Sequence, residues 1–169
     1  ATSIVMLAAG LLFYGGLAIR KSKYQHSGTK IISAAVALII VYGTAAPLTG
    51  KLPVGGIASS LGRDSTLTGR SDIWATLVPI ALSNAILGHG YGGFWTNERR
   101  ASLPFFPAHS GYLETLLAIG FVGISLFLVL AWSSSALISR ELRMDYDSGV
   151  LWACWLIMAL LNNITEATL

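Results

Sequence analysis

Hydrophobic residues gather in four long runs that contain no charged side chain, at residues 1–19, 31–49, 115–139 and 148–165. A helix needs about 20 predominantly apolar residues to cross the hydrocarbon core of a bilayer. Each run is close to this length, so we expect about four transmembrane helices. The longest stretch between them is the segment 50–110, which is rich in glycine and aromatic residues.

Basic residues mark the two short connections between these runs: Arg20, Lys21, Lys23 and Lys30 in the first, and Arg140 and Arg143 in the second. Short loops rich in Lys and Arg stay in the cytoplasm. Because both connections then lie inside, the segment 50–110 is predicted to be an outer-face loop region.

This outer segment contains a further apolar stretch, SDIWATLVPIALSNAILG at 71–88. Ser71 and Asp72 are typical of a helix start, and Pro79 would kink the helix interior. If the stretch crossed the membrane, the two basic connections would lie on opposite sides. We therefore expect an interfacial or re-entrant helix against the outer surface.

Composition supports a membrane location for the whole chain. Of its 169 residues 54% are hydrophobic and 11% are charged, with a mean hydropathy of +0.66. Soluble domains carry about 25% charged residues, so a soluble globule is excluded. We predict an all-α polytopic membrane protein with one membrane domain over 1–169. Since the last residues are still apolar, we expect the chain to be a fragment of a larger membrane protein or a partial gene product.

Arginines are the candidate anion-binding residues of the outer segment: Arg63, Arg70, Arg99 and Arg100. A guanidinium is a permanently charged, fork-shaped donor suited to phosphate. Arg63 and Arg70 lie in the turn LGRDSTLTGRSD, which leads into the predicted helix start, another favourable place for an anion. Alternatively, the arginines contact lipid headgroups or pair with Asp64 and Asp72.

His109 stands just before the third apolar run. A neutral histidine is able to accept a proton from a sugar hydroxyl; the alternative is that His109 caps the helix or contacts headgroups. Glu114 follows five residues later, about 140° around a helix, so we expect no His–Glu dyad. Gly120 and Gly123 are spaced for close helix packing.

Three other motifs carry weaker signals. The stretch GHGYGGFW at 88–95 suits an aromatic anchor at the membrane interface or stacking on a sugar ring. Asn162 and Glu166 share a helix face, which favours packing against other polar groups. The acidic triplet DYD at 145–147 lies in a short connection, and we expect no metal site there.

Four motifs, TLTGRSDIW, GHGYGGFW, HSGYLETLLAIGFVG and NNITE, occur in this order. Together they resemble the O-antigen ligase and O-antigen and exopolysaccharide polymerase superfamily. His109 and Ser110, nine further residues, and then Gly120-x-x-Gly123 match the histidine motif of that family. The similarity covers roughly residues 35–169 and implies that the chain is the C-terminal part of such a larger protein. The TLTGR and GYGGFW motifs are most similar to the exopolysaccharide polymerase branch.

This resemblance implies a multi-pass glycosyltransferase of the bacterial inner membrane with a periplasmic active face. Such enzymes take a glycan from undecaprenyl diphosphate and transfer it to a sugar hydroxyl. The acceptor is lipid A core for ligases and another lipid-linked glycan for polymerases. The resemblance implies no metal, no other cofactor and no nucleic acid, and membrane lipids as surroundings.

Site residues follow by position within the family's motifs. Arg70 matches the arginine that binds the donor diphosphate, and His109 matches the histidine that activates the acceptor hydroxyl. The family often varies at its other arginines, so the resemblance extends only weakly to the further candidates for diphosphate contact, Arg63, Arg99 and Arg100. We add three candidate supporting residues that no family motif assigns: Glu114, Asn162 and Glu166.

Two other function classes stay open. A transporter or flippase would bind lipid-linked sugars without chemistry, and its typical features are ionisable residues in mid-span and broken helices in matched repeats. The predicted spans are uncharged and continuous, which favours the enzyme. A structural membrane subunit whose outer loop docks a partner is the third possibility.

Overall fold

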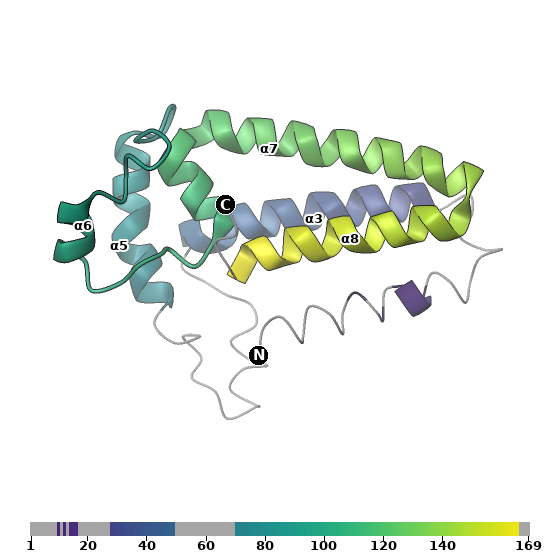
Figure 1. The fold of residues 1–169 in the computed structure, drawn as a ribbon, viewed down its shortest axis with the longest axis horizontal. Helices are drawn as coiled ribbons and strands as arrows, with labels where there is room; N and C mark the ends of the chain where they lie inside the picture. Colours follow the sequence, from purple (N-terminus) through teal and green to yellow (C-terminus); the bar gives the residue numbers. More distant parts are fainter. Residues whose placement is uncertain (1–9, 11, 13, 17–27, 50–69, 166–169) are drawn as a thin grey trace, which may run out of the picture. The chain divides into compact units, whose positions relative to one another are not determined.

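The computed structural model describes residues 10, 12, 14–16, 28–49 and 70–165. These residues contain no strand, and residues 10, 12 and 14–16 are helical. The labelled helices are α3 (Gly28–Thr49), α5 (Arg70–Ser83), α6 (Asn97–Ser102), α7 (Gly111–Met144) and α8 (Tyr146–Thr165) (Figure 1). The all-α prediction is therefore confirmed. Most of the first apolar run, and Arg63 and Glu166, lie outside the described residues.

Three of the described helices are long and apolar enough to cross a membrane: Lys30–Thr49, Gly111–Met144 and Tyr146–Ile164. They contain the apolar runs predicted at 31–49, 115–139 and 148–165. In contrast, α5 has 14 residues. At 1.5 Å per residue it reaches about 21 Å, short of the roughly 30 Å hydrocarbon core. It therefore has the length expected of a non-spanning helix, and its place at the outer surface stays a prediction.

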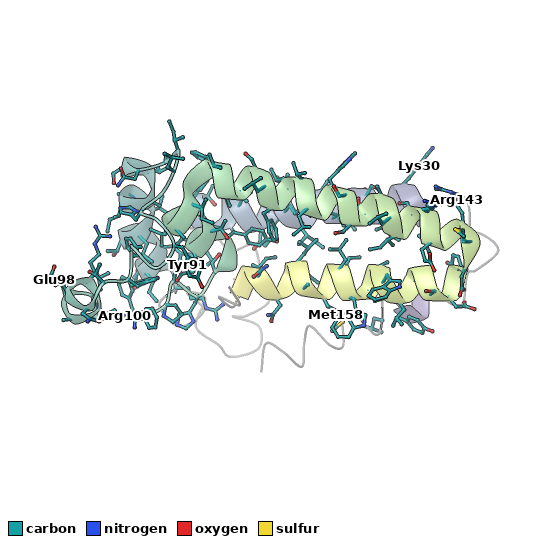
Figure 2. The ribbon with its side chains drawn as sticks, turned by 45° about the horizontal axis from the view of Figure 1, so that its top comes forward. Lys30, Tyr91, Glu98, Arg100, Arg143 and Met158 are labelled. Atoms are coloured by element: carbon teal, nitrogen blue, oxygen red, sulfur yellow. The ribbon has the colours of Figure 1, made fainter. Side chains whose placement is uncertain are left out.

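Residue contacts divide the chain into two compact units. Unit 1 consists of Ala1–Val41 and Leu126–Asn163, and unit 2 of Tyr42–Ser125 and Ile164–Leu169. The core of unit 1 combines apolar side chains of α3, the second part of α7 and α8, among them Ile32, Val36, Ala131, Ile138, Leu142, Val150 and Ala153. Lys30 and Arg143 lie at the same end of this unit (Figure 2). This agrees with both basic connections lying on one side of the membrane.

A single residue, Asp145, joins α7 to α8 in unit 1. Its Oδ1 accepts hydrogen bonds from the backbone N–H groups of Asp147 and Ser148, at 3.1 and 3.4 Å. Asp is a preferred helix N-cap because its carboxylate satisfies such N–H groups. The first residue of the DYD triplet is thus a helix cap.

The core of unit 2 brings α5 together with the end of α3 and the start of α7. Its buried residues are Ala46, Trp74, Leu77, Ala81, Phe94, Ala108, Leu113, Leu116 and Leu117. Helices α3 and α7 approach each other at Gly43, where an added Cβ would collide with the ring of Tyr112. The absence of a side chain at Gly43 therefore lets the two helices meet here.

Helix α7 is interrupted at Gly120, where φ is 67° and ψ is −155°. Two helical segments therefore meet at this residue. The backbone N–H groups of Phe121 and Val122 donate to the carbonyls of Ala85 and Ile86, at 2.7 and 3.2 Å. These carbonyls belong to the turn after α5. The turn thus supplies acceptors that a continuous α7 would have provided itself.

The exchange also runs in the other direction. The carbonyls of Leu117 and Ala118 would bond the N–H groups of residues 121 and 122 in a continuous helix. They accept instead from the N–H groups of His89 and Gly90, at 2.9 and 2.8 Å. Backbone polar groups at membrane depth require such partners. Four bonds between α7 and the α5 turn therefore replace two bonds within α7.

Two glycines make this exchange possible. Gly88 has φ 66°, and an added Cβ would lie 2.6 Å from the backbone of Ala118. At Gly120 a Cβ would lie 2.5 Å from the carbonyl oxygen of Ala85. Our expectation of a continuous span with Gly120 as a helix-packing residue is wrong. Residues 84–88 also form this turn instead of extending α5 beyond Ser83.

We predict that Gly120→Ala in the full-length protein lowers the thermal unfolding midpoint in detergent by more than Gly90→Ala does. Gly90 also has a positive φ, 86°, but an added Cβ there meets nothing within 4 Å. Gly90→Ala therefore adds only backbone strain, about 1–2 kcal/mol, whereas Gly120→Ala adds a collision with carbonyl groups. Equal midpoints for the two variants would contradict the bond exchange.

Candidate functional site

His109 lies in a tight turn directly before α7, and its side chain is half-buried. Its φ is 53°, in the left-handed region that non-glycine residues rarely adopt. Such a conformation costs on the order of 1–3 kcal/mol and persists only where the surroundings impose it. The contacts on either side of His109 are therefore decisive.

Ser110 follows His109 and caps α7. Its side chain is fully buried, its Oγ accepts from the N–H of Leu113 at 3.4 Å, and its carbonyl accepts from the N–H of Glu114 at 2.9 Å. The alternative that His109 itself caps the helix is therefore wrong. The imidazole is left to other interactions.

Ala108 precedes His109, and both of its backbone polar groups are held by side chains. Its carbonyl accepts a hydrogen bond from Nε1–H of Trp74, at 2.9 Å. Its N–H donates to Oε1 of Glu114, at 2.7 Å. Ala108 and Trp74 are both almost completely buried. The turn is thus fixed from α5 on one side and from α7 on the other.

Glu114 binds a third segment through its second oxygen, because Oε2 accepts from Nε1–H of Trp95 at 2.8 Å. Trp95 belongs to the 88–95 segment, and its ring meets those of Phe94 and Phe106 edge to face, with centroids 4.7 and 5.0 Å apart. The expectation that Glu114 forms no dyad with His109 agrees with these bonds to Ala108 and Trp95.

Arg70 is the first residue of α5 and is half-buried. Residues four apart lie on the same face of a helix, so Arg70 shares the face of Trp74. Trp74 in turn donates to Ala108, the neighbour of His109. The structure therefore links the α5 face that carries Arg70 to the turn that carries His109.

Arg99 and Arg100, both on α6, stack on aromatic rings. The guanidinium of Arg99 lies 4.8 Å from the ring centroid of Phe94, and that of Arg100 lies 4.3 Å from the centroid of Phe106. Arg99 also donates to the carbonyl of Phe94, and Arg100 to that of Trp95. Both arginines thus stabilise the aromatic cluster that Phe94, Trp95 and Phe106 form. Their role in diphosphate binding stays a prediction.

The GHGYGGFW segment divides into an exposed and a buried part. Tyr91 is 93% exposed (Figure 2), whereas Phe94 is 1% exposed. The Nδ1 of His89 lies 3.2 Å from the carbonyl oxygen of Leu117, at the break in α7, and its ring packs on Phe94. His89 is therefore a structural residue, and Tyr91 is the residue that faces outward.

The remaining candidates are Asn162, Arg63 and Glu166. Asn162 lies in the last turns of α8, is half-buried and belongs to unit 1. Arg63 and Glu166 lie outside the described residues. Among the residues that the structure describes, no group of three or more His, Cys, Asp or Glu side chains is arranged to hold a metal ion.

Comparison with known proteins extends the sequence resemblance. The chain is 24% identical over 157 residues to the exopolysaccharide production protein ExoQ of Rhizobium meliloti (strain 1021). The match covers 86% of this chain and 34% of that protein, so the chain spans about a third of the length of this relative. No solved structure matches the chain.

A family model described as O-antigen ligase matches residues 1–128. This range includes the TLTGR, GYGGFW and histidine motifs, with Arg70, His109 and Glu114, and ends before NNITE. The match covers more than half of the chain and confirms the resemblance predicted from the motifs. The chain belongs to the O-antigen ligase family.

Proposed function

We propose that this chain is part of a glycosyltransferase of the bacterial inner membrane. It moves a glycan from undecaprenyl diphosphate to a sugar hydroxyl at the periplasmic face. The acceptor is lipid A core in a ligase and another lipid-linked glycan in a polymerase. Membership of the O-antigen ligase family supports a glycan-transferring role in polysaccharide synthesis. The similarity to ExoQ, an exopolysaccharide production protein, agrees with that role.

The observation that carries this proposal is the hydrogen bond from Trp74 to the carbonyl of Ala108. It ties the turn of His109 to the helix face that begins with Arg70. A cation and a proton acceptor on neighbouring elements suit the two ends of a glycosyl transfer. The strained backbone of His109 supports a functional role, because such strain is typical of active sites.

Each residue has a defined part in the proposed reaction. The imidazole of His109 accepts the proton of the acceptor hydroxyl as its oxygen attacks the anomeric carbon. The bond between that carbon and the diphosphate oxygen breaks, and undecaprenyl diphosphate leaves with the electron pair. Arg70 stabilises the negative charge that develops on the diphosphate. The proton thus goes to His109, the electron pair leaves with undecaprenyl diphosphate, and the proposed reaction needs no cofactor.

We predict that His109→Asn in the full-length protein lowers the transfer rate by about 10²–10⁴-fold, the range expected for loss of a general base. Asn tolerates a positive φ better than other non-glycine residues, so this variant removes the base and preserves the turn. The measurement is product formation by purified protein from a lipid-linked donor. An unchanged rate at normal expression contradicts the role of His109.

We also predict that Arg70→Ala lowers the rate by about 10²–10³-fold, because a donor to the developing charge is lost. Arg143→Ala is the matched control, since Arg143 is an exposed arginine in unit 1 at the far end of α7. The same product assay applies. If Arg70→Ala and Arg143→Ala retain equal activity, Arg70 does not bind the diphosphate.

One observation favours a second candidate, a lipid-linked sugar transporter or flippase without glycosyl-transfer chemistry. The break in α7 at Gly120 is the kind of discontinuity found at transporter binding sites. Transporters pair such breaks in matched repeats, and in the part of the chain described by the structure only α7 contains one. A single broken helix is therefore weaker support for a transporter than two broken helices in matched repeats would be.

Product analysis in liposomes separates the two candidates. The full-length protein is reconstituted with lipid-linked donor and acceptor, and new glycosidic bonds are measured alongside donor translocation. The transferase makes a product with a new linkage. Translocation of the donor without any new linkage would establish the flippase and contradict the transferase.

A further inference from the structure

We propose that Glu114 is the positioning residue of this site: it holds the turn of His109 in its productive conformation and couples that turn to the aromatic segment 88–95. This inference rests on the proposed role of His109 as the proton acceptor. Glu114 itself takes no proton in the reaction and acts through the backbone of Ala108.

Glu114 accepts hydrogen bonds through both of its carboxylate oxygens. Oε1 accepts from the backbone N–H of Ala108 at 2.7 Å, and Oε2 accepts from Nε1–H of Trp95 at 2.8 Å. Both donors are neutral, and hydrogen bonds to an ionised carboxylate are shorter and stronger than those between neutral groups. The carboxylate is therefore bound by two segments that approach α7 from different parts of the sequence.

Ala108, which Glu114 binds, directly precedes His109 in the chain. Its N–H is the last backbone donor before His109, whose φ is 53°. Trp74 fixes the carbonyl of the same residue. Glu114 therefore holds the peptide plane before Ala108 and Trp74 holds the plane between Ala108 and His109, which together limit rotation about the backbone bonds of Ala108. A carboxylate at position 114 thus stabilises a backbone conformation that is unfavourable by itself.

Trp95 connects Glu114 to further residues of the aromatic cluster. Its ring packs edge to face on Phe106, which also carries the guanidinium of Arg100. The backbone carbonyl of Trp95 accepts from Nε of the same arginine. A shift of Phe106 or Arg100 therefore moves the indole of Trp95 and changes its hydrogen bond to Glu114.

The test is Glu114→Gln in the full-length protein. The amide keeps the size of the side chain, but its NH2 group must face one of the two N–H donors and loses that hydrogen bond. We expect kcat to fall by about 10²-fold, the loss that a misplaced catalytic group produces. KM for the lipid-linked donor should stay within about twofold, because Arg70 is unaffected.

Two variants accompany it. Glu98→Gln is the matched control, since Glu98 is an exposed glutamate on α6 (Figure 2) and should leave kcat unchanged. Trp95→Phe keeps one aromatic ring and removes the N–H donor together with the rest of the indole, so kcat should fall at least about fivefold, the effect of one lost hydrogen bond. The double variant Glu114→Gln with Trp95→Phe should lose less than the product of the two single effects, because the residues share a bond.

A readout independent of activity tests the turn itself. His109→Cys is labelled with a maleimide in a background where Cys154 is replaced by Ala and any other cysteine is removed. Adding Glu114→Gln should accelerate labelling several-fold, because the turn is released. Adding Glu98→Gln should leave the labelling rate unchanged.

The outcomes separate this inference from the proposed function. If His109→Asn keeps full activity, the proposed role of His109 fails whatever Glu114 does. If His109→Asn is inactive while Glu114→Gln keeps its kcat and its labelling rate, the positioning role alone is overturned. If Glu114→Gln does not fold, Trp95→Phe decides: an unchanged kcat and an unchanged labelling rate for Cys at position 109 overturn the inference.

Discussion

The exchange of backbone hydrogen bonds at Gly120 is the constraint on which the rest of unit 2 depends. Within a membrane, a helix cannot be broken unless its freed N–H and C=O groups find other partners. Here the turn after α5 supplies those partners, and α7 supplies partners for that turn. The short helix α5 is thereby fixed against the first turns of α7. This attachment brings Trp74 within reach of Ala108.

The site then follows from side chains that close a strained turn. Trp74 and Glu114 hold the two polar groups of Ala108, and His109 takes a conformation that it would not adopt alone. The carboxylate and the indole come from elements that the bond exchange has already placed. The conformation of the turn at His109 thus depends on the hydrogen bonds at the break in α7. In the proposed role of His109 as the base, a turn that is already held in this way needs no rearrangement when the acceptor arrives, which is the advantage of preorganisation.

The sequence predicts the membrane helices well because a bilayer imposes a simple length and polarity rule. The apolar runs at 31–49, 115–139 and 148–165 all lie within observed helices. The same rule does not locate the break in α7. Gly120 is apolar and small, so its spacing from Gly123 reads as helix packing, and its positive φ depends on carbonyls more than 30 residues away in the chain.

The candidate site divides in the same way. The family motif identifies His109, whereas the argument from helix periodicity that separates it from Glu114 does not apply, because His109 lies before the start of α7 with a positive φ. The partners of Glu114 are beyond such reasoning, because periodicity holds only within a helix and the chain turns back at Ala108. The bond from Trp74 joins residues 34 positions apart and leaves no local pattern. An unpaired carboxylate in an apolar helix start is the one signal that could have led to this network.

The most direct test of the account is a structure of the full-length protein with a bound undecaprenyl-diphosphate donor and an acceptor sugar. The account predicts the diphosphate in contact with Arg70 and an acceptor hydroxyl within about 3 Å of an imidazole nitrogen of His109. A donor diphosphate bound elsewhere, with no acceptor hydroxyl near His109, would contradict the proposed site.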